Sequence, residues 1–325
     1  MRRRDFIKVI AGSAAVWPLA ARAQRPNLPL IGFLAVSGLA TLPALVDAFH
    51  KGLAEAGYIE GKNVIIEYRW AANYGELPAL ANELVEHHVA VLVAAPLSGG
   101  FAAKAATKTI PIVFESGGDP VEAGLVDNLN HPGGNITGIA AMTQQIVPKR
   151  FQILHDLMPS ASVFAMLVNP DARSTASTSA AAMSAAQALG VQLHILSTKS
   201  PDELPGAFAK IAELQSEALA VTPDPFFHGE RKRILDLAAR YKLPGIYFER
   251  TWVSEGGLMS YSASVPDAFY QIGQYAGRIL KGEKPGNLPI QQPTTFELVI
   301  NLKTANALGL SVPPTLLTIA NEVIE

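Results

Sequence analysis

Polar side chains follow several short apolar runs of the sequence, at points where a small ligand could be hydrogen-bonded. In the first half of the chain Ser37, Ser98 and Ser116 stand in such places, and Pro96 lies just before Ser98. A serine hydroxyl and the free backbone N–H groups at a helix start can together bind a carboxylate. Ser98 and Ser116 could instead cap the following helices, and Glu115 could face either a cleft or solvent.

In the second half of the chain, Asn169, Asp224 and Glu249 follow apolar runs in the same way. The carboxylate of Asp224, which stands between two prolines, could accept a ligand ammonium group, or it could serve only to form a turn. Aromatic side chains near these positions could stack against an aromatic or aliphatic ligand, although such residues commonly belong to a core. The aromatic candidates are Phe226, Tyr247 and Tyr261.

The residue types that most catalytic and cofactor sites require are missing or scattered. The chain has no cysteine, which excludes disulfides, thiolate metal sites and a lipid-modified N-terminal cysteine. His87 and His88 are adjacent and would point to different faces of a helix, so they make a poor metal pair. No HExxH, GxSxG, phosphate-loop or GxGxxG pattern occurs. We therefore expect no cofactor, no metal and no catalytic residues, although active sites can be built without such motifs.

The first 23 residues have the pattern of an export signal that is removed from the mature protein. A basic start precedes an apolar run over residues 9–21, which is too short to span a bilayer. Ala21 and Ala23 offer the small residues of a cleavage site, and the paired Arg3 and Arg4 favour the twin-arginine route over an ordinary secretory signal. The sequence therefore predicts a protein that is exported to the periplasm and free in solution there.

The bulk composition fits two globular domains. The chain has 325 residues, of which 49% are hydrophobic and 17% charged, enough apolar material for two cores and too much for disorder. The formal net charge is −2, and it becomes −6 once the export segment, with five basic residues and one acidic residue, is removed. Neither value indicates a nucleic-acid partner.

Apolar runs alternate with segments of helical period twice along the chain, which is the pattern of parallel sheets covered on both faces. We therefore predict an α/β fold of two Rossmann-like lobes with parallel sheets. Capping boxes at Asp119 and Ser200 predict helix starts. The predicted strands cover residues 30–36, 64–70, 89–94, 110–114, 163–168, 191–196, 218–221 and 244–248.

Three segments stand outside this alternation and are predicted to form a three-segment hinge. Two begin with the glycine pairs 133–134 and 256–257, and the third contains Phe296. Glycine tolerates the backbone changes that a hinge needs, although these segments could also be edge strands with glycine turns. The predicted division is an export signal at 1–23, an N-terminal lobe of 28–141 plus 260–292, and a C-terminal lobe of 142–259 plus 293–325.

Five motifs occur together, in order, along nearly the whole mature chain. They are SGGDPV at 116–121, HPGGNITG at 131–138, GGLMSY at 256–261, ILKGEKP at 279–285 and PTTFELVINLKTA at 293–305. Together they resemble the substrate-binding proteins of ABC transporters, in particular the tryptophan/tyrosine-type group. The resemblance implies a type I periplasmic-binding-protein fold with the ligand in the cleft between the lobes. It also implies delivery of that ligand to a membrane permease and an ATPase, and some members of the group bind aromatic amino acids.

The expected function is that of a periplasmic receptor for an ABC-type importer. We expect hinge closure over a small amino-acid-like or carboxylate-bearing ligand, aromatic ones included. The expected partners are that ligand, the permease and the ATPase, and the receptor itself is expected to be a monomer without a membrane anchor. An exported α/β enzyme with a bound cofactor and a sensing subunit of a membrane signalling protein remain as alternatives. A LacI-type repressor is disfavoured, because the export segment stands where DNA-binding helices would be.

Overall fold

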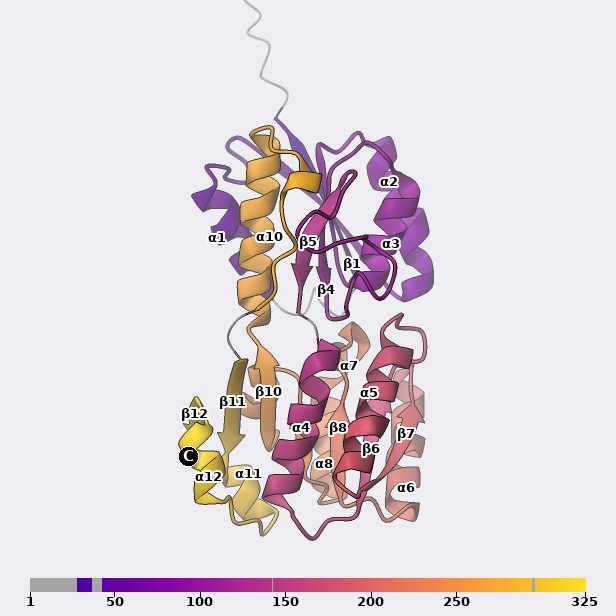
Figure 1. Cartoon of the computed structure of the whole chain (residues 1–325), viewed down its shortest axis with the longest axis vertical. Coiled ribbons are helices and arrows are strands. Elements are labelled where there is room, and N and C mark those ends of the chain that lie inside the picture. Colours follow the sequence, from indigo (N-terminus) through magenta and orange to yellow (C-terminus); the bar gives the residue numbers. More distant parts are fainter. Residues whose placement is uncertain (1–27, 37–42, 142, 294–295) are drawn as a thin grey trace, which may run out of the picture.

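Short apolar runs form the strands of two separate sheets in the computed structural model, which describes residues 28–36, 43–141, 143–293 and 296–325. Each sheet belongs to one of two α/β lobes that lie end to end (Figure 1). The predicted export segment 1–23 and the candidate Ser37 lie outside the described residues. None of the helices among these described residues has both the length and the apolar character that a membrane span requires.

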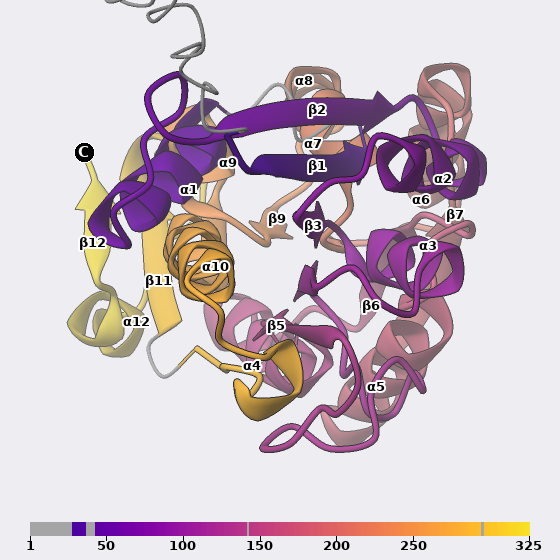
Figure 2. The ribbon, with the colours of Figure 1, turned by 90° about the horizontal axis from the view of Figure 1, so that it is seen from above.

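The first lobe contains a five-stranded parallel sheet in the order β2-β1-β3-β4-β5. Helices α1 and α10 cover one face and helices α2 and α3 the other (Figure 2). The strands are β1 (Leu30–Val36), β2 (Ile65–Ala71), β3 (Val91–Ala94), β4 (Ile112–Ser116) and β5 (Ile136–Ala140). The helices are α1 (Pro43–Glu55), α2 (Leu77–Glu86), α3 (Leu97–Ala106) and α10 (Val265–Leu280), with short 3-10 turns η2 (Tyr74–Glu76) and η4 (Pro285–Asn287).

Strand β3 shows why these strands read as unbroken apolar runs. Val91 and Val93 pack in the core under α1 and α10, whereas Leu92 and Ala94 pack in the core under α2 and α3. Side chains alternate between the two faces of a sheet, and here both faces are buried. An apolar residue is therefore needed at every position of the strand.

The second lobe repeats the strand order of the first and extends it by two strands. Its sheet runs β7-β6-β8-β9-β10-β11-β12, and only the β10–β11 pair among these is antiparallel. The strands are β6 (Val163–Val168), β7 (Gln192–Ser197), β8 (Ala218–Val221), β9 (Gly245–Tyr247), β10 (Met259–Ala263), β11 (Phe296–Asn301) and β12 (Glu322–Ile324). The two sheets confirm the predicted α/β fold with mostly parallel strands.

Helices α4 and α5 cover one face of the second sheet, and α6 and α8 cover the other. The shorter α11 and α12 join the first of these cores, and α7 and α9 join the second. The helices are α4 (Thr143–Leu157), α5 (Thr175–Ala188), α6 (Leu204–Glu213), α7 (Pro225–Gly229), α8 (Arg231–Arg240), α9 (Arg250–Ser254), α11 (Leu302–Ala307) and α12 (Pro314–Ile319), with a 3-10 turn η3 (Pro201–Glu203).

The chain passes between the lobes at three places, between β5 and α4, between β10 and α10, and between η4 and β11 (Figure 1). The third place lies directly before Phe296, where the sequence predicted it. Strand β10 pairs with β9 and β11, so residues 260–263 lie in the second sheet. The sequence pattern had placed the lobe boundary before residue 260, which is inside this strand and not at its end.

The glycine pairs do not lie at these crossings, so their predicted role as hinges is wrong. Gly133 and Gly134 have φ values of 72° and 57° and precede β5, whose other end leads into the crossing. Gly256 has a φ of 111° and lies between α9 and β10. Glycine is favoured at these positions because their φ values are positive, and a residue with a side chain would be strained in such a turn.

The helix predicted at Asp119 is also missing. The Asp119 carboxylate accepts hydrogen bonds from the N–H groups of Val121 and Glu122, at 2.8 and 3.1 Å, as a capping residue would. The chain makes only one turn before Gly124, where φ is 75°. The capping signal therefore starts a turn that the following glycine ends.

Candidate ligand-binding cleft

A cavity lies between the lobes and is lined by residues at the carboxyl ends of strands from both sheets. Open parallel sheets bind their ligands at this edge, and two facing edges here enclose one space. From the first lobe the lining residues are Tyr74, Pro96, Leu97, Ser98, Glu115, Gly117 and Gly118. From the second lobe and the start of α10 they are Ala172, Arg173, Ser174, Thr175, Thr178, Thr222, Pro223, Asp224, Pro225, His228, Phe248 and Val265.

The start of helix α3 forms one wall of the cavity. Pro96 is the N-cap of this helix, and its carbonyl accepts the first helical bonds from Gly99 and Gly100. Ser98, in the first turn, lines the cavity, and its hydroxyl makes no hydrogen bond to another described residue. The unpaired N–H groups of the first turn and this hydroxyl suit an anionic group of a ligand.

Asp224 forms the opposite wall and connects the lobes. Its carboxylate caps α7 through the Phe226 N–H at 2.8 Å and accepts a bond from the Asn169 amide at 3.0 Å. The Tyr74 hydroxyl, from the first lobe, donates to it at 2.7 Å. Burial raises the pKa of Asp224, against the opposing effect of these hydrogen bonds. Burial and the nearby carboxylate raise the pKa of Tyr74, which therefore stays a hydrogen-bond donor.

Arg173 makes a second contact between the lobes. Its guanidinium carbon lies 4.2 Å from the ring centroid of Phe101 on α3, which is cation–π geometry. Arg173 lines the cavity, whereas Phe101 does not. The Tyr74–Asp224 bond and this contact both require the lobes to be close together, so the structure has a closed arrangement.

His228 and Glu249 form a buried pair beside the cavity. The His228 Nε2 lies 2.8 Å from the Glu249 Oε2, and the two side chains are 6% and 10% exposed. Burial by itself would raise the pKa of Glu249. The contact with His228, the hydroxyl of Thr251 and the charge of Arg231 together have a larger opposite effect, so the pKa lies below its ordinary value. The His228 ring packs edge-on against Phe248, which also lines the cavity.

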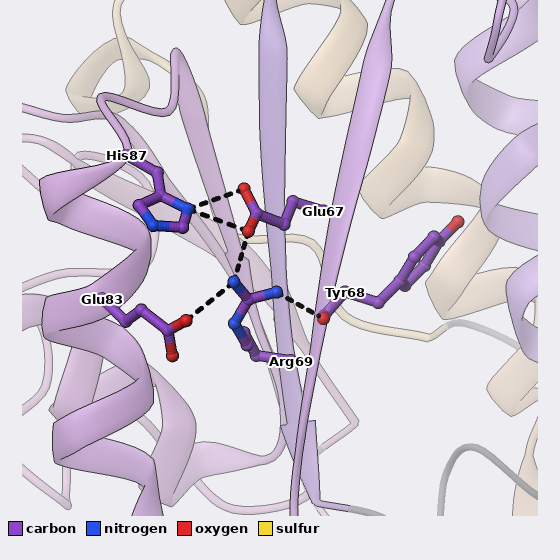
Figure 3. A network of polar contacts seen from close by, with 5 residues as sticks. All are labelled: Glu67, Tyr68, Arg69, Glu83 and His87. Atoms are coloured by element: carbon purple, nitrogen blue, oxygen red, sulfur yellow. Dashed lines mark hydrogen bonds and ion pairs between the residues drawn. The ribbon is translucent and has the colours of Figure 1, made fainter.

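A second histidine–carboxylate contact lies away from the cleft, on the outer part of the first lobe. There His87 and Glu67 are 2.8 Å apart, and Arg69 and Glu83 complete the network (Figure 3). This group connects α2 with the edge strand β2 and is more exposed than the buried pair. His87 therefore contacts the carboxylate of Glu67 and does not form a metal-binding pair with the adjacent His88.

Three of the residues predicted from the sequence line the cavity, namely Pro96, Ser98 and Asp224. Asn169 and Glu249 lie behind the lining and hold Asp224 and His228. Direct contact of these five side chains with a ligand remains a prediction. The placement follows from the topology, because each of them comes directly after a strand.

Ser116 does not line the cavity. Its hydroxyl donates to the Gly118 carbonyl at 2.8 Å and accepts from the Gly118 N–H at 3.1 Å, and the residue is fully buried. The hydroxyl is therefore used to shape the turn that brings Gly117 and Gly118 to the cavity.

The three predicted aromatic residues pack elsewhere. Tyr247 is 2% exposed and stacks on Trp252 at 4.8 Å, and Tyr261 stacks on Phe296 at 5.9 Å. Phe226 lines a separate, neighbouring cavity. The aromatic residues that do line the cleft are Tyr74 and Phe248.

The family model of ABC transporter substrate binding proteins matches residues 34–324. The chain belongs to this family. The "Tyrosine-binding protein" of Clostridioides difficile is 26% identical over 283 residues, which cover 85% of this chain and 81% of that protein.

Two solved structures are similar over most of the chain. A conserved domain protein from Vibrio cholerae superposes with a TM-score of 0.85 at 26% identity, covering 91% of this chain and all of that one. An ABC domain in complex with L-Trp from Streptococcus pneumonia superposes with a TM-score of 0.83 at 23% identity, covering 92% of this chain and 100% of that one. These superpositions include both lobes, as the family fold requires.

Proposed function

We propose that this family member is the receptor of an ABC-type importer and closes over an amino-acid-like or carboxylate-bearing ligand, aromatic ones included. The observation that carries the proposal is the cavity between the lobes to which the strand ends of both sheets contribute. A ligand there contacts both lobes at once, so it stabilises the closed form over the open form. The tyrosine-binding relative and the neighbour with bound L-Trp support an amino-acid ligand.

The polar groups of the cavity suit such a ligand. The start of α3 with Ser98 can receive a carboxylate, and the carboxylates of Asp224 and Glu115 both line the cavity that would hold an ammonium group. Phe248 and Tyr74 supply flat apolar surface for a side chain. These groups bind and orient, and no nucleophile–base pair accompanies them among the lining residues, so a binding role is favoured over an enzymatic one.

The place of action we propose is the periplasm. The basic and apolar pattern of residues 1–23 supports export by the twin-arginine route, and the lack of cysteine supports a freely diffusing receptor. The proposed partners are a permease and an ATPase in the membrane, and the proposed state is a monomer. We propose lobes of 28–141 plus 264–292 and 143–263 plus 293–325, which keeps β10 with its sheet.

Thermal unfolding of the mature protein with a panel of amino acids and aromatic acids tests the proposal. A ligand that binds only the folded state raises the melting temperature in proportion to its concentration relative to Kd. We expect such a shift with at least one member of the panel and no chemical change of that compound. The absence of any shift, together with turnover of a panel compound, contradicts the receptor role and favours an exported enzyme.

A further inference from the structure

Glu115 has an unusual place at the meeting point of two cavities. It is the penultimate residue of β4, and alternation along that strand directs it to the face that carries α10. It lines the cleft and also a neighbouring cavity beside the start of α10, and Val265 likewise lines both. The carboxylate therefore lies next to both the proposed ligand and the crossing between β10 and α10.

The carboxylate of Glu115 has no partner. No hydrogen bond or ion pair connects it to another of the described residues, although the side chain is partly buried. Burial raises its pKa to about 7. An anionic carboxylate removed from water without a partner is costly, so the closed cleft favours either its protonation or the arrival of a positive charge.

The groups around Glu115 do not supply that charge. Arg173 lines the same cleft, but its guanidinium lies over the Phe101 ring and forms no ion pair with Glu115. His228 is paired with Glu249. The other titratable residues that line the two cavities are Tyr74, Asp224 and Asp267.

We propose that Glu115 makes the cleft selective for ligands that carry an ammonium group, so that amino acids bind in preference to carboxylic acids that lack one. This inference rests on the proposed function and narrows its ligand class. The ammonium group would supply the missing counter-charge and make a charge-assisted hydrogen bond. An acid without an amino group would leave Glu115 unpaired in the closed cleft, or require it to be protonated.

Calorimetric titration with matched pairs of ligands tests the inference. The pairs are L-tyrosine with 3-(4-hydroxyphenyl)propanoate, L-tryptophan with 3-(indol-3-yl)propanoate, and L-leucine with 4-methylpentanoate. For the pair that binds, we expect the amino acid to be favoured at least about 10-fold by the wild-type protein, as for a hydrogen bond between charged groups. In Glu115→Gln we expect that preference to fall by about the same factor. Glu86→Gln, an exposed carboxylate on α2 of the same lobe, is the matched control and should keep it.

Proton release gives a second, independent readout. At pH 6 a pKa of about 7 leaves Glu115 mostly protonated in the closed cleft without a ligand, and a bound ammonium group favours its ionised form. We expect amino-acid binding at pH 6 to release a proton, seen as a dependence of the measured heat on the ionisation enthalpy of the buffer. Affinity should rise as the pH increases to about 7 and then level off. Glu115→Gln should lack this release.

The possible failures are distinguishable. Equal affinity of the wild-type protein for both members of a pair, or no proton release at pH 6, overturns the inference and leaves the receptor role intact. An unchanged preference in a folded Glu115→Gln variant does the same. If none of the six compounds binds, both this inference and the proposed receptor function are overturned. If the variant does not fold, the two wild-type measurements still decide.

Discussion

At the scale of single residues, His228 and Glu249 form a buried charged contact beside the cleft. Both side chains are at least nine-tenths buried, and His228 lines the cavity while Glu249 lies behind it. A buried carboxylate is tolerated only with close partners, and here His228 and Thr251 provide them. The pair therefore holds the imidazole in place for the ligand.

Replacing Glu249 by glutamine should destabilise the protein at neutral pH. The change removes the charge that contacts His228 and accepts from the Thr251 hydroxyl, and a hydrogen bond to a charged group contributes about 2 kcal/mol to the free energy of unfolding. The folded protein holds the pKa of Glu249 below its ordinary value of 4.5, so its stabilising effect is present above that pH and is lost as the pH falls through the lower, folded value. Denaturant unfolding at pH 7 and at pH 4 or below should show the difference between wild type and Glu249→Gln shrinking at the acidic end.

The network in Figure 3 offers a matched control for this change. Glu67 also contacts a histidine, but its side chain is 23% exposed and its partner His87 is 44% exposed. Exposed pairs contribute less than about 1 kcal/mol, so Glu67→Gln should cost clearly less than Glu249→Gln. Equal losses in the two variants, or none in Glu249→Gln, would contradict the role assigned to the buried pair.

The sequence located the strand ends but not the side of the strand that faces the cleft. Tyr247 and Glu249 were predicted, whereas the residue between them, Phe248, lines the cavity. Successive side chains of an extended segment point in opposite directions, and a run that is apolar on both faces gives no pattern from which to choose. Tyr74 was missed because it follows β2, an edge strand whose end was not considered. Glu115 was noticed as a charge beside an apolar strand, but its two possible surroundings could not be told apart.

At the scale of elements, the contact between α1 and α10 attaches the returning chain to the first lobe. Helix α10 follows β10 of the second sheet yet packs along α1 of the first (Figure 2). The two helices touch through glycines: a Cβ at Gly273 would lie 2.1 Å from the Phe49 carbonyl oxygen, and one at Gly52 would lie 1.8 Å from that of Tyr270. Such distances leave no room for a methyl group unless the helices move apart.

The variant Gly273→Ala should therefore lower stability, although alanine favours a helix more than glycine does. Forcing extra volume into a packed contact costs about 1–3 kcal/mol, which exceeds the gain in helix propensity of about 1 kcal/mol. Gly206→Ala on α6 is the control, because a Cβ there meets nothing within 4 Å, and only the propensity gain should appear. Denaturant unfolding measures both. A more stable Gly273→Ala protein would contradict the close helix contact.

The elements themselves were largely predictable, and their connections were not. Three predicted strands, 30–36, 163–168 and 218–221, agree with the structure to the residue, because buried apolar runs with helical neighbours have a strong pattern. The glycine pairs were misread because a glycine that forms a turn and one that forms a hinge look the same in a sequence. Pairing with β9 and β11 decides that β10 belongs to the second sheet, and such pairing is a non-local property.

At the scale of the whole molecule, two contacts connect the lobes without a ligand. One is the Tyr74–Asp224 hydrogen bond and the other is the contact between Arg173 and Phe101. Both stabilise the closed form, and the affinity of a receptor depends on the population of the form that binds. Tyr74, Asp224 and Arg173 also line the cavity, so changing them would alter ligand contacts as well. Phe101 packs against the core of the first lobe and does not line the cavity, so changing it leaves the lining residues in place.

Phe101→Leu should therefore weaken ligand binding without removing a contact to the ligand. A cation–π contact contributes about 0.5–2 kcal/mol, and its loss should raise the Kd about 2-fold to 30-fold, mainly through faster dissociation. Stopped-flow fluorescence measures the rates, and small-angle scattering of the free protein should show a larger radius of gyration in the variant. The control is Tyr241→Leu, which removes a partly exposed ring at the end of α8 that packs on Phe208 within the second lobe. An unchanged Kd for Phe101→Leu would contradict the stabilising role of the Arg173 contact in the closed form.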